Sequence, residues 1–118
     1  MDVQVGKIKN HQEKFKGEKE LASENRRGKI INIGNKYFMD LVRKNKYVIL
    51  DVRSYSEYKE RHIINAVSMP AEKLLCSNFK GNTVVVYCES GARSLECAKY
   101  LASRGVVVYN LLNGIGNL

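Results

Sequence analysis

Residues 83–104, TVVVYCESGARSLECAKYLASR, decide the fold that this sequence predicts. The stretch opens with residues 83–87, an uncharged β-branched run that is typical of a strand buried on both faces. A short turn with an internal glycine follows at residues 88–93. From Ser94 to Arg104 apolar residues recur at helical spacing, and Ser94 is placed to cap the helix. The stretch therefore predicts a strand, a tight turn and a helix in succession.

Cys88 lies where the predicted strand meets this turn. A turn of this form aims several backbone N–H groups at one point, and the helix dipole adds partial positive charge there. The thiolate form of a cysteine at that point is favoured, and Arg93, facing back into the loop, would favour it further. A lone cysteine is more often a buried structural residue, but here glycine, arginine, serine and an uncharged strand coincide. We therefore predict that Cys88 is a nucleophile for a sulfur or phosphorus centre.

Apolar runs alternate with helical segments along the rest of the chain. Further strands are predicted at residues 29–33, 47–52, 66–69 and 106–109, and helices at residues 35–44, 55–61 and 71–77. Asn35 and Ser54 are the predicted caps of the first two helices. This alternation predicts an α/β fold with a central parallel five-stranded sheet and helices on both faces. Because ligands of such sheets bind beyond the carboxyl ends of the strands, Cys88 and Asp51 are expected at the ligand-binding edge.

Length and composition exclude several classes of protein. The 118 residues are typical of one domain, and neither a membrane-spanning apolar run nor an apolar signal-peptide core is present, so we expect a cytoplasmic protein with no membrane partner. The net charge of +8 is spread along the chain, which argues against nucleic acid as a partner but would assist the capture of small anions. Three cysteines without a Cys-x-x-Cys pair, and two scattered histidines, predict neither a disulfide framework nor a metal site.

The first part of the chain differs from the rest in composition. Residues 1–29 are polar and mixed in charge, with few apolar residues and no sustained periodicity. We predict a basic, poorly ordered arm there and a folded domain over residues 30–118. A solvated extension is the favoured interpretation of the arm, and a docking tail for a partner or an acidic surface is the alternative.

The turn resembles the active loop of the rhodanese-like family, the single-domain sulfurtransferases. The family pattern Cys-x-x-Gly-x-Arg-Ser is matched in place by Cys88, Gly91, Arg93 and Ser94. An upstream signature is matched by Leu50-Asp51-Val52-Arg53, Glu57-Tyr58, His62-Ile63, Ala66 and Pro70, and a closing segment by Asn110-Leu111 and Gly114-Ile115. The resemblance covers about residues 30–118, and three ordered segments at compatible spacing make it specific.

This resemblance implies a sulfurtransferase of the thiosulfate sulfurtransferase type. Cys88 would take the outer sulfur of a small anionic donor, such as thiosulfate or a polysulfide, and hold it as a persulfide. A thiol, a cyanide-like acceptor or a protein thiol would then remove that sulfur. Main-chain N–H groups would stabilise the anionic persulfide, and the residues that supply this binding loop are Glu89, Ser90, Gly91, Ala92, Arg93 and Ser94. We expect no cofactor, no metal and a monomer.

Several roles around the loop have two interpretations. Arg93 either pairs with an anionic donor or braces the loop by bonding to carbonyl groups. Glu89 opposes anion binding if it points inward and matters little if it points to solvent. Asp51 and Arg53 are candidates for the rim of the pocket, although a turn-capping carboxylate is the favoured role of Asp51. Arg53 is expected to pair with Asp51 or Glu57.

Two other functions are weighed against sulfur transfer. Phosphatases and arsenate reductases resemble rhodaneses in fold and use a longer Cys-to-Arg loop, whereas only four residues separate Cys88 from Arg93. The shorter loop leaves less room for phosphate. A non-catalytic binding module of the same fold is the other alternative, and the retention of Cys88, Gly91 and Arg93 argues against it.

Overall fold

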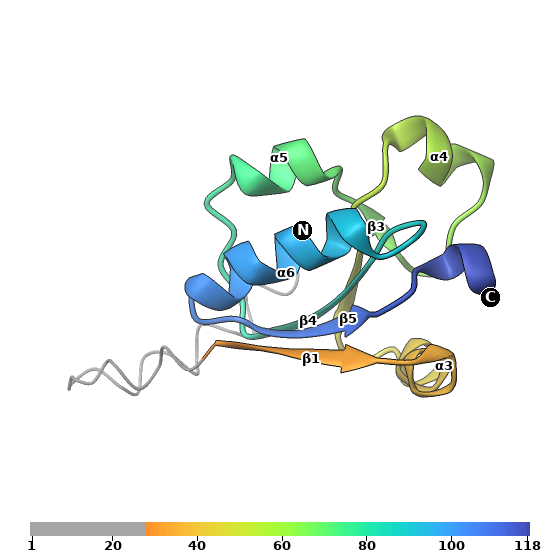
Figure 1. The fold of residues 1–118 in the computed structure, drawn as a ribbon, viewed down its shortest axis with the longest axis horizontal. Helices are drawn as coiled ribbons and strands as arrows, with labels where there is room; N and C mark the ends of the chain where they lie inside the picture. Colours follow the sequence, from red (N-terminus) through yellow and green to blue (C-terminus); the bar gives the residue numbers. More distant parts are fainter. Residues whose placement is uncertain (1–27) are drawn as a thin grey trace.

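The uncharged run that begins the deciding stretch forms β4 (Thr83–Tyr87), the central strand of a five-stranded sheet in the computed structural model (Figure 1). The structure describes residues 28–118, so all but the end of the predicted arm lies outside the described residues. The strand order is β1-β5-β4-β2-β3, and every neighbouring pair is parallel. The predicted α/β fold with a parallel sheet is therefore confirmed.

The other elements follow the predicted order closely. The remaining strands are β1 (Lys29–Ile33), β2 (Val48–Asp51), β3 (Val67–Ser68) and β5 (Val107–Leu111). The helices are α3 (Asn35–Lys44), α4 (Tyr55–Glu60), α5 (Ala71–Leu75) and α6 (Ala92–Ser103), and a 3₁₀ turn, η2 (Ile115–Asn117), ends the described chain. Within this part of the chain, none of the helices is long and apolar enough to cross a membrane.

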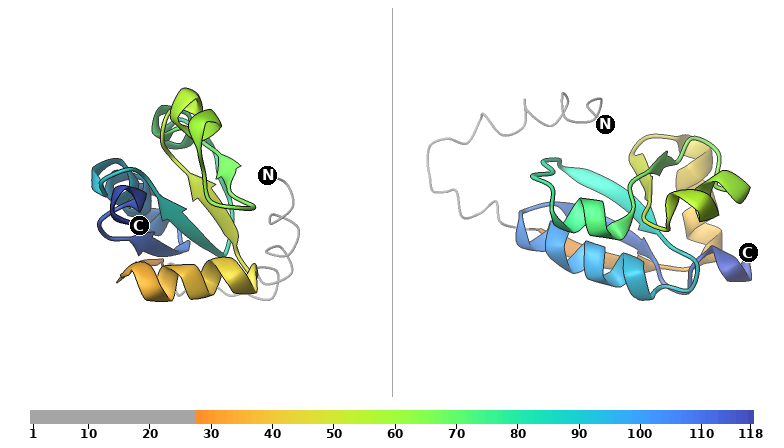
Figure 2. Two further views of the ribbon diagram at one scale, coloured as in Figure 1. Left: turned by 90° about the vertical axis from the view of Figure 1, so that its right-hand side faces the viewer. Right: turned by 90° about the horizontal axis from the view of Figure 1, so that it is seen from above.

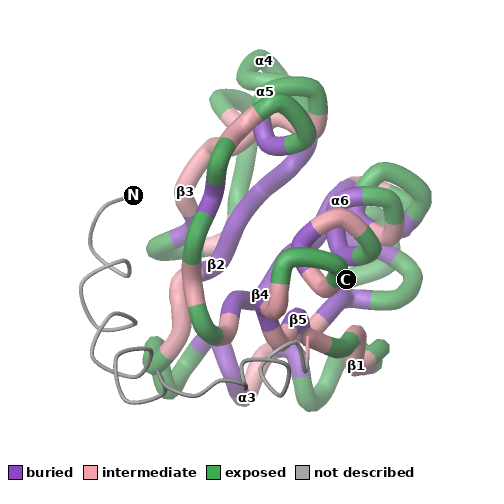
Figure 3. The backbone as a smooth tube through the Cα atoms, turned by 90° about the vertical axis from the view of Figure 1, so that its left-hand side faces the viewer, coloured by how far each residue is buried: buried purple, intermediate pink, exposed green. Residues whose placement is uncertain are grey.

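Each face of the sheet is covered by its own helices, because side chains along a strand alternate between faces. Val84 and Val86 of β4 pack in one cluster with residues of α5 and α6, whereas Val85 and Tyr87 pack in the other with Phe38 of α3. Figures 1 and 2 show α3 on one side of the sheet and α5 and α6 on the other. Residues 84–87 of β4 are all buried (Figure 3), so the strand that leads into Cys88 lies in the middle of the core.

The helix starts differ in part from the predicted caps. Ser54 caps α4 as predicted, in a full capping box in which its hydroxyl accepts a hydrogen bond from the backbone N–H of Glu57. The other two predicted caps were wrong, because Gly34 occupies the N-cap of α3 and Gly91 that of α6. Ser94 lies inside the first turn of α6, where its hydroxyl donates to the carbonyl of Gly91 over 3.3 Å. A glycine can make this sharp entry into a helix without a side-chain cap.

Candidate active site

The thiol of Cys88 lies inside the turn that links β4 to α6. Its Sγ accepts hydrogen bonds from the backbone N–H groups of Gly91, at 3.1 Å, and Ser94, at 3.3 Å. Hydrogen bonds from amides are strongest when the acceptor is an anion, so this cradle suits a negatively charged sulfur. The residue is fully buried, so a donor molecule reaches Sγ only when neighbouring groups move aside.

The turn has this shape because residue 91 is a glycine. Gly91 has φ = 108°, in the region that side chains rarely adopt, and a Cβ there would lie 2.3 Å from the carbonyl oxygen of Leu112. A side chain at this position would therefore obstruct the turn. Ser90 and Ala92 flank it on the exposed outer side of the loop.

The segment that follows β5 supports the loop from behind. The N–H of Ile115 donates to the carbonyl of Cys88 at 3.0 Å, and the N–H of Gly116 donates to that of Glu89 at 2.9 Å. Gly114 has φ = 75°, and a Cβ on it would lie 2.2 Å from the same Glu89 carbonyl. Two glycines thus allow the closing segment to approach the loop backbone and hold its first two carbonyl groups. The sequence showed these glycines without showing what they contact.

A buried ion pair lies at the end of β2, beside the loop. The Asp51 carboxylate accepts from the Arg53 backbone N–H at 2.9 Å, which is the turn-capping role favoured for it, and from the Arg53 guanidinium at 2.8 Å. It also accepts from the Tyr87 hydroxyl at 2.6 Å. Burial and this bond to Asp51 raise the pKa of Tyr87 well above its usual range. Asp51 and Arg53 are both buried, so they lie beneath the surface of the site. They are linked to the loop through Glu89.

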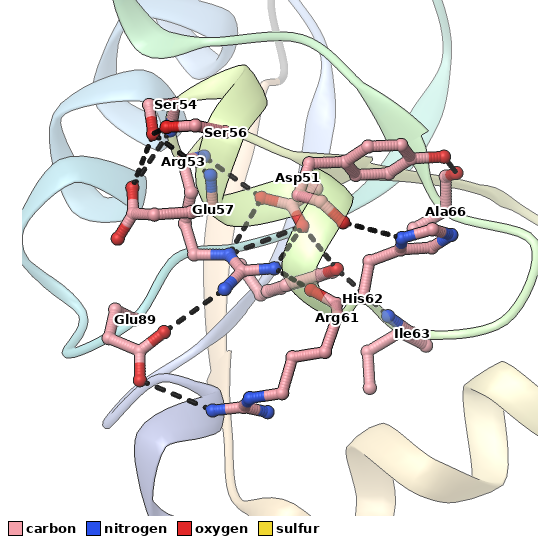
Figure 4. A network of polar contacts seen from close by, with 12 residues as sticks. Asp51, Arg53, Ser54, Ser56, Glu57, Arg61, His62, Ile63, Ala66 and Glu89 are labelled. Carbon is pink, nitrogen blue, oxygen red and sulfur yellow. Dashed lines mark hydrogen bonds and ion pairs between the residues drawn. The ribbon is translucent and has the colours of Figure 1, made fainter.

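Glu89 is the residue through which this ion pair reaches the loop. The buried guanidinium of Arg53 donates to Glu89 Oε1 at 3.1 Å, and Arg61 approaches Glu89 Oε2 at 3.4 Å (Figure 4). Burial opposes the charge of Arg53, but its bonds to Asp51 and Glu89 raise its pKa above the usual range. The prediction that Arg53 pairs with Asp51 or Glu57 is therefore confirmed with Asp51 as the partner, and Glu89 is an additional partner. Neither predicted effect of Glu89 on anion binding applies, because two arginines neutralise its charge.

Arg93 also has a partner that neither predicted role included. Its guanidinium donates two hydrogen bonds to the carboxylate of Glu57 on α4, at 2.8 and 3.2 Å. The bonds from Arg93, followed by the backbone bond from Ser54, lower the pKa of Glu57 to about 2. This bidentate pair joins the first turns of α4 and α6 beside the loop, and both side chains remain partly exposed.

The other candidate ligands and nucleophiles do not join the site as reactive groups. Cys97 is buried in the core, and burial, followed by the nearby charge of Cys88, raises its pKa to about 12. Cys76 is exposed and unpaired. His62 bonds through Nδ1 to the carbonyl of Tyr58 and stacks on its ring, so its role is structural. Among residues 28–118, no group of three or more metal-ligating side chains is gathered.

Comparisons with known proteins agree with this geometry. The Rhodanese-like domain family matches residues 34–117. The thiosulfate sulfurtransferase GlpE of Coxiella burnetii is 38% identical over 79 residues, which cover 64% of this chain and 74% of that protein. The tRNA sulfurtransferase of Thermoplasma acidophilum is 40% identical over 62 residues, or 52% of this chain, but this match spans only 13% of that longer protein.

Solved structures show the same fold. A rhodanese homologue from Thermus thermophilus superposes with a TM-score of 0.60 at 22% identity, covering 74% of this chain and 99% of that one. A human single-domain sulfurtransferase gives a TM-score of 0.57 at 18% identity, covering 72% of this chain and 91% of that one. At these identities the likeness concerns the arrangement of sheet and helices.

Proposed function

Because the chain belongs to the rhodanese-like domain family, we propose that it is a sulfurtransferase that carries a sulfane sulfur as a persulfide on Cys88. The thiolate attacks the outer sulfur of a donor such as thiosulfate or a polysulfide. The bond between that sulfur and the rest of the donor breaks, and the leaving group keeps the electron pair. A thiol or a cyanide-like acceptor then takes the sulfur from Cys88, which returns to the thiolate.

The observation that carries this proposal is the pair of backbone N–H groups directed at Sγ. The bonds from Gly91 and Ser94 are fixed by the turn and by the start of α6, so they need no rearrangement when negative charge develops. The persulfide is an anion bonded to the same Sγ that these two N–H groups contact. Removing one donor of this kind costs about 10²- to 10³-fold in rate in enzymes that use such a site.

The structure offers less support for the two alternatives. A phosphatase needs its loop arginine to bind the oxyanion, and here the guanidinium of Arg93 is engaged by Glu57. A binding module without activity has no need of a cysteine whose sulfur accepts two main-chain hydrogen bonds. We include in the proposal a monomer in the cytoplasm, where thiol acceptors are kept reduced.

The test is intact-mass spectrometry of the full chain after exposure to thiosulfate or a polysulfide. The protein should gain the mass of one sulfur atom, and cyanide or a reducing agent should remove it. Cys88→Ser should gain nothing, whereas Cys76→Ser should still gain the sulfur, because Cys76 is exposed and takes no part in the loop. Release of phosphate from an aryl phosphate without a sulfur adduct would instead favour the phosphatase, and no reaction with either compound would favour the binding module.

A further inference from the structure

The three arginines around the loop are all paired with carboxylates of this chain. Arg93 is bound by Glu57 through two bonds, and the guanidinium of Arg53 is shared by Asp51 and Glu89. Arg61 also approaches Glu89, at 3.4 Å. Although the chain carries a net charge of +8, the positive groups at the site are therefore largely compensated.

We propose that Glu57 determines the donor specificity of the site by occupying Arg93, so that donors with one negative charge at the transferring end are preferred to the dianion thiosulfate. This inference rests on the proposed sulfur transfer at Cys88. An organic thiosulfonate and a persulfide belong to the preferred class, since each has one ionised group at the reacting end. Glu57 acts through Arg93, so it is a specificity-determining residue that does not itself touch the donor.

The geometry favours the internal pair over an incoming anion. Glu57 is presented by α4 in a fixed orientation, because its Oε1 also accepts the N–H of Ser54 at 2.9 Å in the capping box. The two bonds from Nη1 and Nη2 use one edge of the Arg93 guanidinium and hold a compensating carboxylate against its charge. Glu57 keeps its charge at neutral pH, because its pKa is held at about 2. A second anion near Arg93 must therefore displace this carboxylate or approach it against like-charge repulsion.

Two sulfur donors that differ in charge can test whether Glu57 sets the charge preference of the site. With thiosulfate, a bond forms between Sγ of Cys88 and the outer sulfur, the donor S–S bond breaks, and sulfite leaves with the electron pair. With methanethiosulfonate the same bonds form and break, and methanesulfinate leaves. The two donors transfer the same atom, and one charged oxygen of thiosulfate is replaced by a methyl group. Their relative rates therefore report the charge preference of the site.

The experiment compares kcat/KM for the two donors, with cyanide as acceptor, in the wild type and in Glu57→Gln. Glutamine removes the charge but can still accept the Ser54 N–H, as in other capping boxes. Asp40→Asn is the matched control, because it removes the same charge from a pair with Arg43 on α3, which covers the face of the sheet opposite to α6. In Glu57→Gln the ratio of thiosulfate to methanethiosulfonate kcat/KM should rise about two- to fivefold, the scale of one partly exposed ion pair.

The control and the remaining outcomes of this comparison are interpreted as follows. The ratio should stay at the wild-type value in Asp40→Asn. If Glu57→Gln changes kcat/KM equally for both donors, Glu57 controls access or the orientation of Arg93, and the specificity proposal is overturned. A lower ratio in Glu57→Gln would overturn it as well. If the wild type forms no persulfide with either donor, the proposed function itself fails.

Discussion

The contact between Gly114 and the active loop provides a sharp test of how the loop is held. Gly114→Ala places a methyl group where the structure has 2.2 Å to the carbonyl oxygen of Glu89 and 2.5 Å to the backbone nitrogen of Ser90. Both neighbours are backbone atoms of the loop that carries Cys88, so no flexible side chain can move aside. Either the closing segment or the loop must shift.

The size of the effect follows from two contributions. A non-glycine residue at φ = 75° and ψ = 173°, a region that is essentially restricted to glycine, costs about 1–3 kcal/mol, so the free energy of unfolding should fall by an amount in that range or more. Relief of the contact requires a displacement of about 1 Å, and a misplacement of that size at a reacting centre can cost about 100-fold in rate. We therefore expect persulfide formation on Cys88 to slow by about two orders of magnitude while the variant remains folded.

The assay is the second-order rate of sulfur uptake by intact mass, with urea unfolding measured on the same sample. Gly34→Ala is the matched control, because a Cβ at Gly34 meets nothing within 4 Å and φ is −92°. It should keep the wild-type rate and lose at most about 1 kcal/mol from the N-cap of α3. If Gly114→Ala is folded and reacts within about threefold of the wild type, the closing segment does not position the loop, and the reasoning from these contacts is wrong.

Three further predictions concern the charges and thiols of the domain. Asp51→Asn leaves the guanidinium of Arg53 buried without its main counter-ion, so urea unfolding should show a loss of about 3 kcal/mol, and a loss below about 1 kcal/mol would contradict this role. The folded-state pKa of Glu57 is lowered from 4.5 to about 2, so its contribution is complete above pH 4.5 and is lost as the pH falls toward 2. For this partly exposed pair we expect about 0.2–1 kcal/mol, so the difference in melting temperature between wild type and Glu57→Gln should shrink over that range, and a constant difference would argue against the pair. Cys97, whose pKa is raised to about 12, should resist iodoacetamide at pH 9 while the exposed Cys76 is alkylated, and peptide mapping that finds Cys97 modified in folded protein would refute its burial.

The parts of the structure that the sequence predicted well are those fixed by neighbouring residues. β4 spans Thr83–Tyr87 as predicted, because the ends of the uncharged apolar run mark where the strand begins and ends. The sulfur cradle is equally local, since its donors, Gly91 and Ser94, lie three and six residues from Cys88. β3 is shorter than predicted, and only Val67 and Ser68 pair with β2.

The parts that escaped prediction depend on which distant groups the fold brings together. Arg93 and Glu57 are 36 residues apart, and so are Arg53 and Glu89. With twelve acidic residues in the chain, charge alone cannot identify the partner of a given arginine. The contacts of the closing segment could not be predicted either, because the spacing of its glycines does not indicate which carbonyl groups they approach.

One of these pairs nevertheless has a signal that can be derived from topology. In a parallel sheet with helical crossovers, the helix after each strand begins at the same edge of the sheet. β2 and β4 are neighbours, so the first turns of α4 and α6 must lie close together at that edge. The capping box fixes Glu57 in the first turn of α4, and Arg93 is the second residue of α6. An acidic residue and a basic residue at adjacent helix starts can meet without further rearrangement. The same topology that directs backbone N–H groups toward Cys88 thus also brings a carboxylate within reach of the loop arginine.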